Sequence, residues 1–157
     1  MEYKSLVKDF SDRTEQNLML IEYISNKDSS RAFEVTQLIN SLLGLIILPQ
    51  QKFFDKIPND SIEKAKTNGW LIPTPSSKYK QVKDLSTYLR YIRNGVSHFN
   101  IKFVSESETI VGIQIWNKPP RSDINWKINL NIEEIKSITR KFKELIAEYA
   151  KESGSDF

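Results

Sequence analysis

The spacing of apolar residues changes near residue 100, and this change constrains the fold more than any other feature of the chain. Before that point apolar residues recur every three or four positions, which is the period of an amphipathic helix. Between residues 101 and 130 they form short alternating runs typical of strands. Helical spacing then returns from Ile132 onward. The sequence therefore predicts a mainly α fold, a helical bundle with a small antiparallel sheet inserted before the C-terminal helix.

The predicted helices are separated by residues that stop or start a helix. They are expected near residues 3–25, over 33–48, in short pieces over 51–60 and 61–68, over about 80–99, and from 132 to about 152. Pro49 and Gly69 follow two of them as stop signals. Asn131 with Glu134 three residues later predicts a capping box at the start of the last helix.

Length and composition limit the classes of protein that this chain can belong to. With 157 residues and 39% hydrophobic content, we expect one domain over residues 1–152 and a flexible tail over 153–157. No apolar run reaches the ~18 residues of a membrane span, and residues 1–9 lack the apolar core of a signal peptide. The chain has no cysteine and one histidine, which disfavours disulfides and a zinc site. A cytoplasmic protein without membrane contact, metal or cofactor is expected.

The only histidine, His98, follows Arg93 and Asn94 at the end of the predicted helix over 80–99. Arginine presents a planar, permanently charged fork that matches the oxygens of a phosphate. Histidine is the side chain that most readily exchanges protons near neutral pH. Arg93, Asn94 and His98 are therefore candidate catalytic residues for cleaving a phosphodiester. Spacing alone also allows a non-catalytic role, because a lone histidine is more often a surface or capping group.

A spacing of five places Arg93 and His98 about 140° apart on an ideal helix. Three arrangements would still let both act on one phosphate: the helix unwinds at Gly95, the arginine reaches around, or two chains share their groups. The third is attractive because RNA transesterification benefits from both a base and an acid, and a two-fold dimer supplies two histidines.

Other polar residues share the predicted helix face with His98. Lys80, Lys83, Arg90 and Ser97 fall within about a 100° arc around it and are candidate RNA-binding residues. The other interpretation is an ordinary solvated face, and charge alone favours it. The opposite, buried face is predicted to comprise Leu85, Leu89, Ile92, Val96 and Phe99.

Two further features each allow two interpretations. Glu34, Gln37, Ser41 and Gly44 form a polar or small stripe on the apolar helix over 33–48, which either lines a site, lets two helices approach, or faces water. Trp70, Trp116 and Trp126 either stack on RNA bases or pack in a core or interface, and the second is favoured.

Residues 93–98 (RNGVSH) resemble the signature of HEPN domains, in which an arginine, a polar residue and three further residues precede a histidine. Residues 33–49 and 88–99 resemble a plasmid- and prophage-type bacterial HEPN subfamily, and the likeness covers most of the chain. The resemblance implies metal-independent RNA cleavage without a cofactor, by a homodimer whose motifs meet at the dimer cleft. It also implies a toxin or anti-phage effector, with RNA as substrate and a cognate antitoxin or inhibitor as a partner.

Carried over by position, Arg93 would hold the scissile phosphate, Asn94 would position groups around it, and His98 would move the proton. HEPN toxins controlled by a partner nucleotidyltransferase resemble a longer motif with a tyrosine two residues after the histidine. This chain has Asn100 there, so that control is not expected. The alternatives are a non-catalytic HEPN-type module that binds nucleic acid, nucleotide or protein, and a structural role. The presence of all three residues, Arg93, Asn94 and His98, favours the enzyme over both alternatives.

Overall fold

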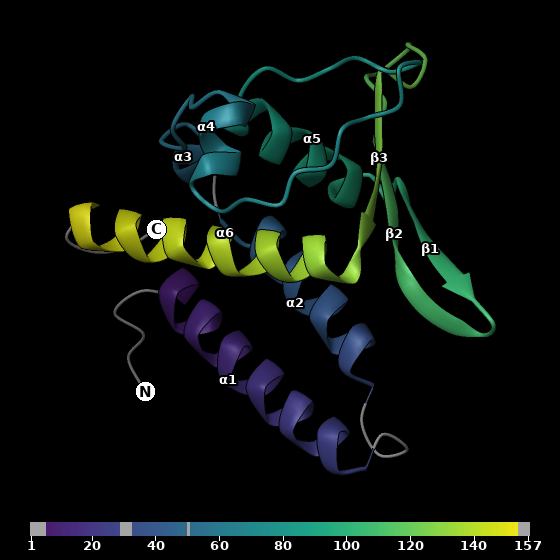
Figure 1. Cartoon of the computed structure of the whole chain (residues 1–157). Helices are drawn as coiled ribbons and strands as arrows, with labels where there is room; N and C mark the ends of the chain where they lie inside the picture. The colour runs from purple at the N-terminus through teal and green to yellow at the C-terminus, as the bar shows by residue number, and fades with distance from the viewer. Residues whose placement is uncertain (1–5, 29–32, 50, 154–157) are drawn as a thin grey trace. The chain divides into compact units, whose positions relative to one another are not determined.

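The computed structural model describes residues 6–28, 33–49 and 51–153 (Figure 1). The elements in chain order are α1 (Leu6–Lys27), α2 (Glu34–Ile47), α3 (Gln51–Phe54), α4 (Ile62–Thr67), α5 (Leu85–Ser97), β1 (Ile101–Glu106), β2 (Thr109–Asn117), β3 (Trp126–Asn131) and α6 (Ile132–Ser153). The fold class is confirmed: the chain is mainly α, with a small antiparallel sheet immediately before the C-terminal helix. The predicted start of the first helix near residue 3 lies outside the described residues.

The chain divides into two compact units, one of residues 1–56 and 139–157 and one of residues 57–138. Helix α6 contributes its first turns to the second unit and the rest to the first. A single domain over residues 1–152 stays a prediction. The predicted tail begins at Ser153, which is the last residue of α6, and residues 154–157 lie outside the described residues. No helix within 6–28, 33–49 and 51–153 combines the length and the apolar character needed to cross a membrane.

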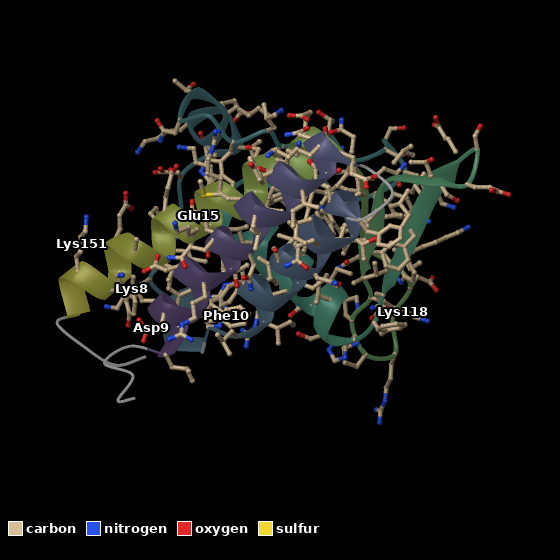
Figure 2. All side chains as sticks on the ribbon, turned by 90° about the horizontal axis from the view of Figure 1, so that it is seen from below. Lys8, Asp9, Phe10, Glu15, Lys118 and Lys151 are labelled. Atoms are coloured by element: carbon tan, nitrogen blue, oxygen red, sulfur yellow. The ribbon has the colours of Figure 1, made fainter. Side chains whose placement is uncertain are left out.

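In the first unit, α1 and α2 lie side by side (Figure 1). A β carbon at Gly44 of α2 would lie 2.9 Å from the ring of Phe10, which projects from an early turn of α1 (Figure 2). Lys143 of α6 forms an ion pair with Glu15 of α1 and lies 3.8 Å from Asp12. An aromatic cluster packs around the α3 helix, formed by Phe53, Phe54, Phe142 and Tyr149.

In the second unit, a buried serine connects α6 to the segment that follows α4. The Ser137 hydroxyl accepts a hydrogen bond from the Leu71 amide at 3.0 Å and donates to the Gly69 carbonyl at 3.3 Å. Helix α4 begins at Ser61, whose hydroxyl accepts from the Lys64 amide, and the chain leaves it at Gly69 with a φ of 87°. Gly69 acts as the predicted stop, because this left-handed conformation is readily adopted by glycine.

The three strands form an antiparallel sheet in the order β1-β2-β3. Ile113 pairs with Leu130 and Ile115 with Ile128, and these four side chains form a buried face of the sheet. On the opposite face the Gln114 amide donates to the Asn129 side-chain oxygen at 2.7 Å. Strands β2 and β3 therefore alternate between a buried apolar face and a more exposed face, as their alternating sequence predicts.

The last helix starts at the predicted capping box. The Glu134 amide donates to the Asn131 side-chain oxygen at 2.9 Å, and the Glu134 carboxylate accepts from the Asn131 amide at 2.8 Å. Two amides that the first turn of a helix leaves unpaired are thereby satisfied. The box fixes the point at which β3 becomes α6.

Candidate functional site

The candidate site lies at the C-terminal end of α5, in the second unit. The N-cap residue of the helix is Asp84, whose carboxylate accepts hydrogen bonds from the Thr87 amide at 2.7 Å and the Thr87 hydroxyl at 3.0 Å. The predicted start near residue 80 is therefore wrong, because Asp84 caps the helix four residues later. The buried face of α5 comprises Leu85, Ser86, Tyr88, Leu89, Ile92 and Gly95. This face anchors the helix, and the motif occupies its last turns.

Helix α5 ends beside the sheet (Figure 1). Gly95, in the middle of the motif, packs directly against β2. A β carbon here would overlap the Ile115 side chain and lie 3.0 Å from the Trp116 carbonyl oxygen. The α-helix is continuous through Gly95. The option that the helix unwinds at this glycine is therefore wrong: its lack of a side chain serves close packing, not a break in the helix.

The end of α5 is closed by a Schellman motif. The Asn100 amide donates to the Gly95 carbonyl at 2.7 Å, and the Phe99 amide donates to the Val96 carbonyl at 3.0 Å. Phe99 has a φ of 57°, the left-handed conformation this motif requires. The Asn100 carbonyl then accepts from the Trp116 amide of β2 at 3.1 Å. The residues around His98 are thus held by backbone hydrogen bonds to both the helix and the sheet.

The three motif residues differ in exposure. Arg93 is half-buried, and Asn94 and His98 are exposed. His98 is the C-cap residue, and its amide donates to the Asn94 carbonyl at 3.1 Å. Because the helix is regular between Arg93 and its end, the separation of about 140° expected for a spacing of five applies. The structure therefore presents an accessible imidazole and a neighbouring amide side chain at a rigid helix end.

The structure separates the predicted RNA-binding residues into two groups. Arg90 and Ser97 lie on α5, where the Arg90 Nε donates to the Ser86 hydroxyl at 3.5 Å. Lys80 and Lys83 precede the helix, so their placement on the same helical face as His98 is wrong. The Lys80 amide donates to the Asn125 carbonyl and the Lys83 carbonyl accepts from the Ile62 amide, while both lysine side chains are exposed.

The stripe of polar or small residues on α2, formed by Glu34, Gln37, Ser41 and Gly44, belongs to the first unit. Ser41 is buried and its hydroxyl donates to the Gln37 carbonyl at 2.9 Å, whereas Glu34 and Gln37 are half-buried. Gly44 contacts the Phe10 ring, so at that position the stripe lets two helices approach. A stripe that faces water throughout is excluded, because Ser41 is only 2% exposed.

Two of the three tryptophans are buried. Trp70 and Trp126 pack in the core, which is the interpretation that the sequence favours. Trp126 contacts Tyr88, with the ring centroids 5.8 Å apart. Trp116 is half-buried, and the Lys127 ammonium lies 5.7 Å from its ring centroid. Among the residues that the structure describes, no three of His, Asp and Glu come together as a candidate metal site.

Two residues of the predicted buried face of α5 are less buried than expected: Val96 is half-buried, and the placement of Phe99 is wrong. Its spacing from Ile92 and Val96 placed it on the buried face of α5, yet its side chain is 87% exposed. The helix ends at Ser97, two residues before Phe99, so the helical spacing does not extend to this residue. A glycine at this position would have signalled the Schellman end, but the chain has phenylalanine there.

The sequence also matches a known protein family over most of its length. The family model described as HEPN pEK499 p136 matches residues 1–153. The chain belongs to this HEPN family. No curated protein and no solved structure gives a match. Membership places the protein among HEPN modules, which are nucleotide-binding or RNase-type in general.

Proposed function

We propose that this HEPN protein is a metal-independent endoribonuclease that cleaves RNA by attack of the 2′-hydroxyl on the neighbouring phosphate. The observation that carries the proposal is the Arg93-Asn94 pair and His98 at the rigid end of α5, with the imidazole exposed. A substrate phosphate needs to reach both a cation and a proton-transfer group, and this helix end offers both.

The proposed mechanism assigns one role to each motif residue. His98 removes the proton from the 2′-hydroxyl, whose oxygen then forms a bond to phosphorus. Arg93 stabilises the negative charge that grows on the non-bridging phosphate oxygens, and Asn94 orients the reacting groups. The bond from phosphorus to the 5′-oxygen breaks, and that oxygen takes a proton. The products are a 2′,3′-cyclic phosphate and a 5′-hydroxyl.

A second copy of the chain completes the proposed site. The leaving oxygen needs a proton donor, and the chain has a single histidine. The angular separation of Arg93 and His98 on a regular helix also favours groups from two chains around one phosphate. A homodimer with the two motifs near its axis meets both requirements.

The biological role that we propose is that of a cytoplasmic toxin or anti-phage effector, restrained by a cognate antitoxin or inhibitor. A ribonuclease without a bound inhibitor would arrest growth of its host. Control by nucleotide transfer to a tyrosine is not part of the proposal, because Asn100 occupies that position and its backbone is engaged by β2.

The deciding experiment incubates purified protein with RNA and with DNA of the same sequence, with EDTA present. We expect cleavage of RNA only, and 2′,3′-cyclic phosphate and 5′-hydroxyl ends, because DNA lacks the nucleophile. His98→Ala should lower the rate by about 10²–10⁴-fold, as expected for loss of a general acid–base. Asn68→Ala is the matched control, because Asn68 is the exposed C-cap residue of α4.

Each opposite outcome points to a different conclusion. Cleavage of DNA, dependence on a divalent ion or 5′-phosphate ends would contradict the mechanism. Full activity of His98→Ala would contradict the site. Binding of RNA without any cleavage would favour the alternative, a non-catalytic HEPN-type module that binds nucleic acid, nucleotide or protein.

A further inference from the structure

Phe99 gains almost nothing from burial and holds an unfavourable backbone conformation. Its side chain is 87% exposed, the highest value among the large hydrophobic residues that the structure describes. Its φ of 57° lies in the left-handed region, where a β carbon crowds the backbone. A bulky residue in this conformation is a genuine outlier.

Glycine would serve the Schellman motif better than phenylalanine. The hydrogen bonds that close α5 come from the backbone of Phe99 and Asn100, so they do not require a side chain at position 99. Glycine adopts the required φ without steric cost. The stability of the fold therefore does not explain why an aromatic residue occupies this position. Residues that keep a strained backbone conformation concentrate at functional sites.

The position of Phe99 relative to the motif indicates what the ring does. It follows His98 directly, so the two Cα atoms are separated by one peptide unit, about 3.8 Å. Both side chains are exposed. The Schellman hydrogen bonds and the contact of Asn100 with β2 hold the backbone of both residues, so the ring is carried on a fixed support.

We propose that Phe99 binds RNA by stacking on a nucleobase next to the phosphate at which His98 acts. This inference rests on the proposed ribonuclease function and adds a substrate-binding residue to it. Stacking on an exposed aromatic face accepts any base, so it strengthens binding and orients the ribose without imposing a sequence. A nucleobase is the part of RNA that such an uncharged ring recognises, whereas Arg93 recognises the phosphate.

The test measures thermal stability and RNA affinity in the same variants. In a His98→Ala background, which slows cleavage by about 10²–10⁴-fold, Phe99→Gly should weaken binding of a labelled single-stranded oligoribonucleotide by about 5- to 150-fold. The same substitution should raise the Tm by about 2–4 °C, because it relieves the left-handed strain. Phe99→Trp should retain the affinity, because it keeps an aromatic face. A purely structural residue would not move stability and affinity in opposite directions.

Ser107→Gly is the matched backbone control. Ser107 is exposed and has a φ of 46° in the turn between β1 and β2, so glycine relieves the same kind of strain there without removing an aromatic ring. We expect this variant to gain stability and to bind RNA as the parent does.

The outcomes separate this inference from the proposed function. If the wild type cleaves RNA and Phe99→Gly changes neither affinity nor KM, the stacking role is wrong and the ribonuclease stands. If Phe99→Gly converts a dimer into a monomer by light scattering, Phe99 is a subunit contact and the stacking role is also wrong. If the wild type neither binds nor cleaves RNA, the proposed function fails and the stacking role fails with it.

Discussion

Gly95 of α5 lies so close to Ile115 of β2 that a β carbon on the glycine would overlap the isoleucine side chain. The Trp116 carbonyl is 3.0 Å from the same position, so both a buried side chain and the sheet backbone limit the space. Helix α5 and the sheet are therefore in direct contact in the middle of the motif. This contact orients Arg93, Asn94 and His98 relative to the rest of the second unit.

We expect Gly95→Ala to destabilise the protein. Alanine is favoured over glycine within a helix by about 0.8–1.0 kcal/mol, but overpacking a well-packed core costs about 1–3 kcal/mol. The clash should prevail, because Ile115 is fully buried and the Trp116 carbonyl belongs to the backbone. Urea unfolding measures the loss. Ser97→Ala, an exposed substitution in the same helix, should change stability by no more than about 0.5 kcal/mol. A gain in stability for Gly95→Ala would contradict the contact.

Removing the capping box should also lower stability. Asn131→Ala removes the side-chain oxygen that accepts from the Glu134 amide, and loss of an N-cap typically costs about 1 kcal/mol. Asn131→Gly should cost less, because glycine is tolerated at an N-cap. Thermal unfolding of the two variants measures the difference. Equal stability of the alanine variant and the wild type would show that the box contributes nothing.

Much of the fold was predictable because its signals are local. The capping box of Asn131 and Glu134 depends on residues three apart, and the stop at Gly69 depends on one conformation. The strands follow a period of two over short segments. Each such signal comes from neighbouring residues, so the pattern alone indicates the element.

The features that the sequence did not predict have two origins. Some depend on contacts between segments that are distant in sequence, and others on capping residues that end or start a helix where the apolar spacing would continue it. Ser137 binds the backbone at Gly69 and Leu71, a contact that nothing near Ser137 in the sequence indicates. The helical period continues through Lys80 and Lys83, yet the Asp84 cap starts α5 after them. At the candidate site, the order Arg93-Asn94-His98 was evident, but the exposure of Phe99 required knowing where the helix ends.

Tyr88 provides a third stability prediction, because its hydroxyl is buried without a hydrogen-bond partner. Tyr88→Phe removes this oxygen and should leave stability at pH 7 unchanged or raise it by up to about 1 kcal/mol. Burial raises the pKa of Tyr88 above its ordinary value of 10.0, and the negative charge of Glu134 raises it further. The folded state therefore keeps the proton at a pH where the unfolded chain loses it.

The difference in the pKa of Tyr88 between the folded and the unfolded state determines how stability changes with pH. Ionisation of the Tyr88 hydroxyl does not affect stability below about pH 10. Above that pH it stabilises the unfolded state by up to about 1.36 kcal/mol per pH unit, so the free energy of unfolding falls. The advantage of Tyr88→Phe over the wild type should therefore widen between pH 10 and 11 in denaturant unfolding. Tyr23→Phe, a change of an exposed tyrosine on α1, is the control and should follow the wild type. A loss of more than 1 kcal/mol at pH 7 in Tyr88→Phe would mean that the hydroxyl has a partner, such as a buried water.

The last prediction concerns the proposed composite site and uses two inactive variants. Arg93→Ala and His98→Ala chains are mixed, unfolded and refolded together so that subunits exchange. If each site takes its arginine from one chain and its base histidine from the other, half of the dimers carry one site with both groups in place. These dimers hold a single histidine and lack the second one that would protonate the leaving oxygen, so activity should recover partly, to no more than about a quarter of the wild-type value. Mixing Arg93→Ala with the Arg93→Ala/His98→Ala double variant supplies no arginine and should recover nothing. Light scattering of the wild type should give twice the chain mass of 18.3 kDa. A monomer at micromolar concentration, or no recovery in the first mixture, would contradict a site shared between two chains.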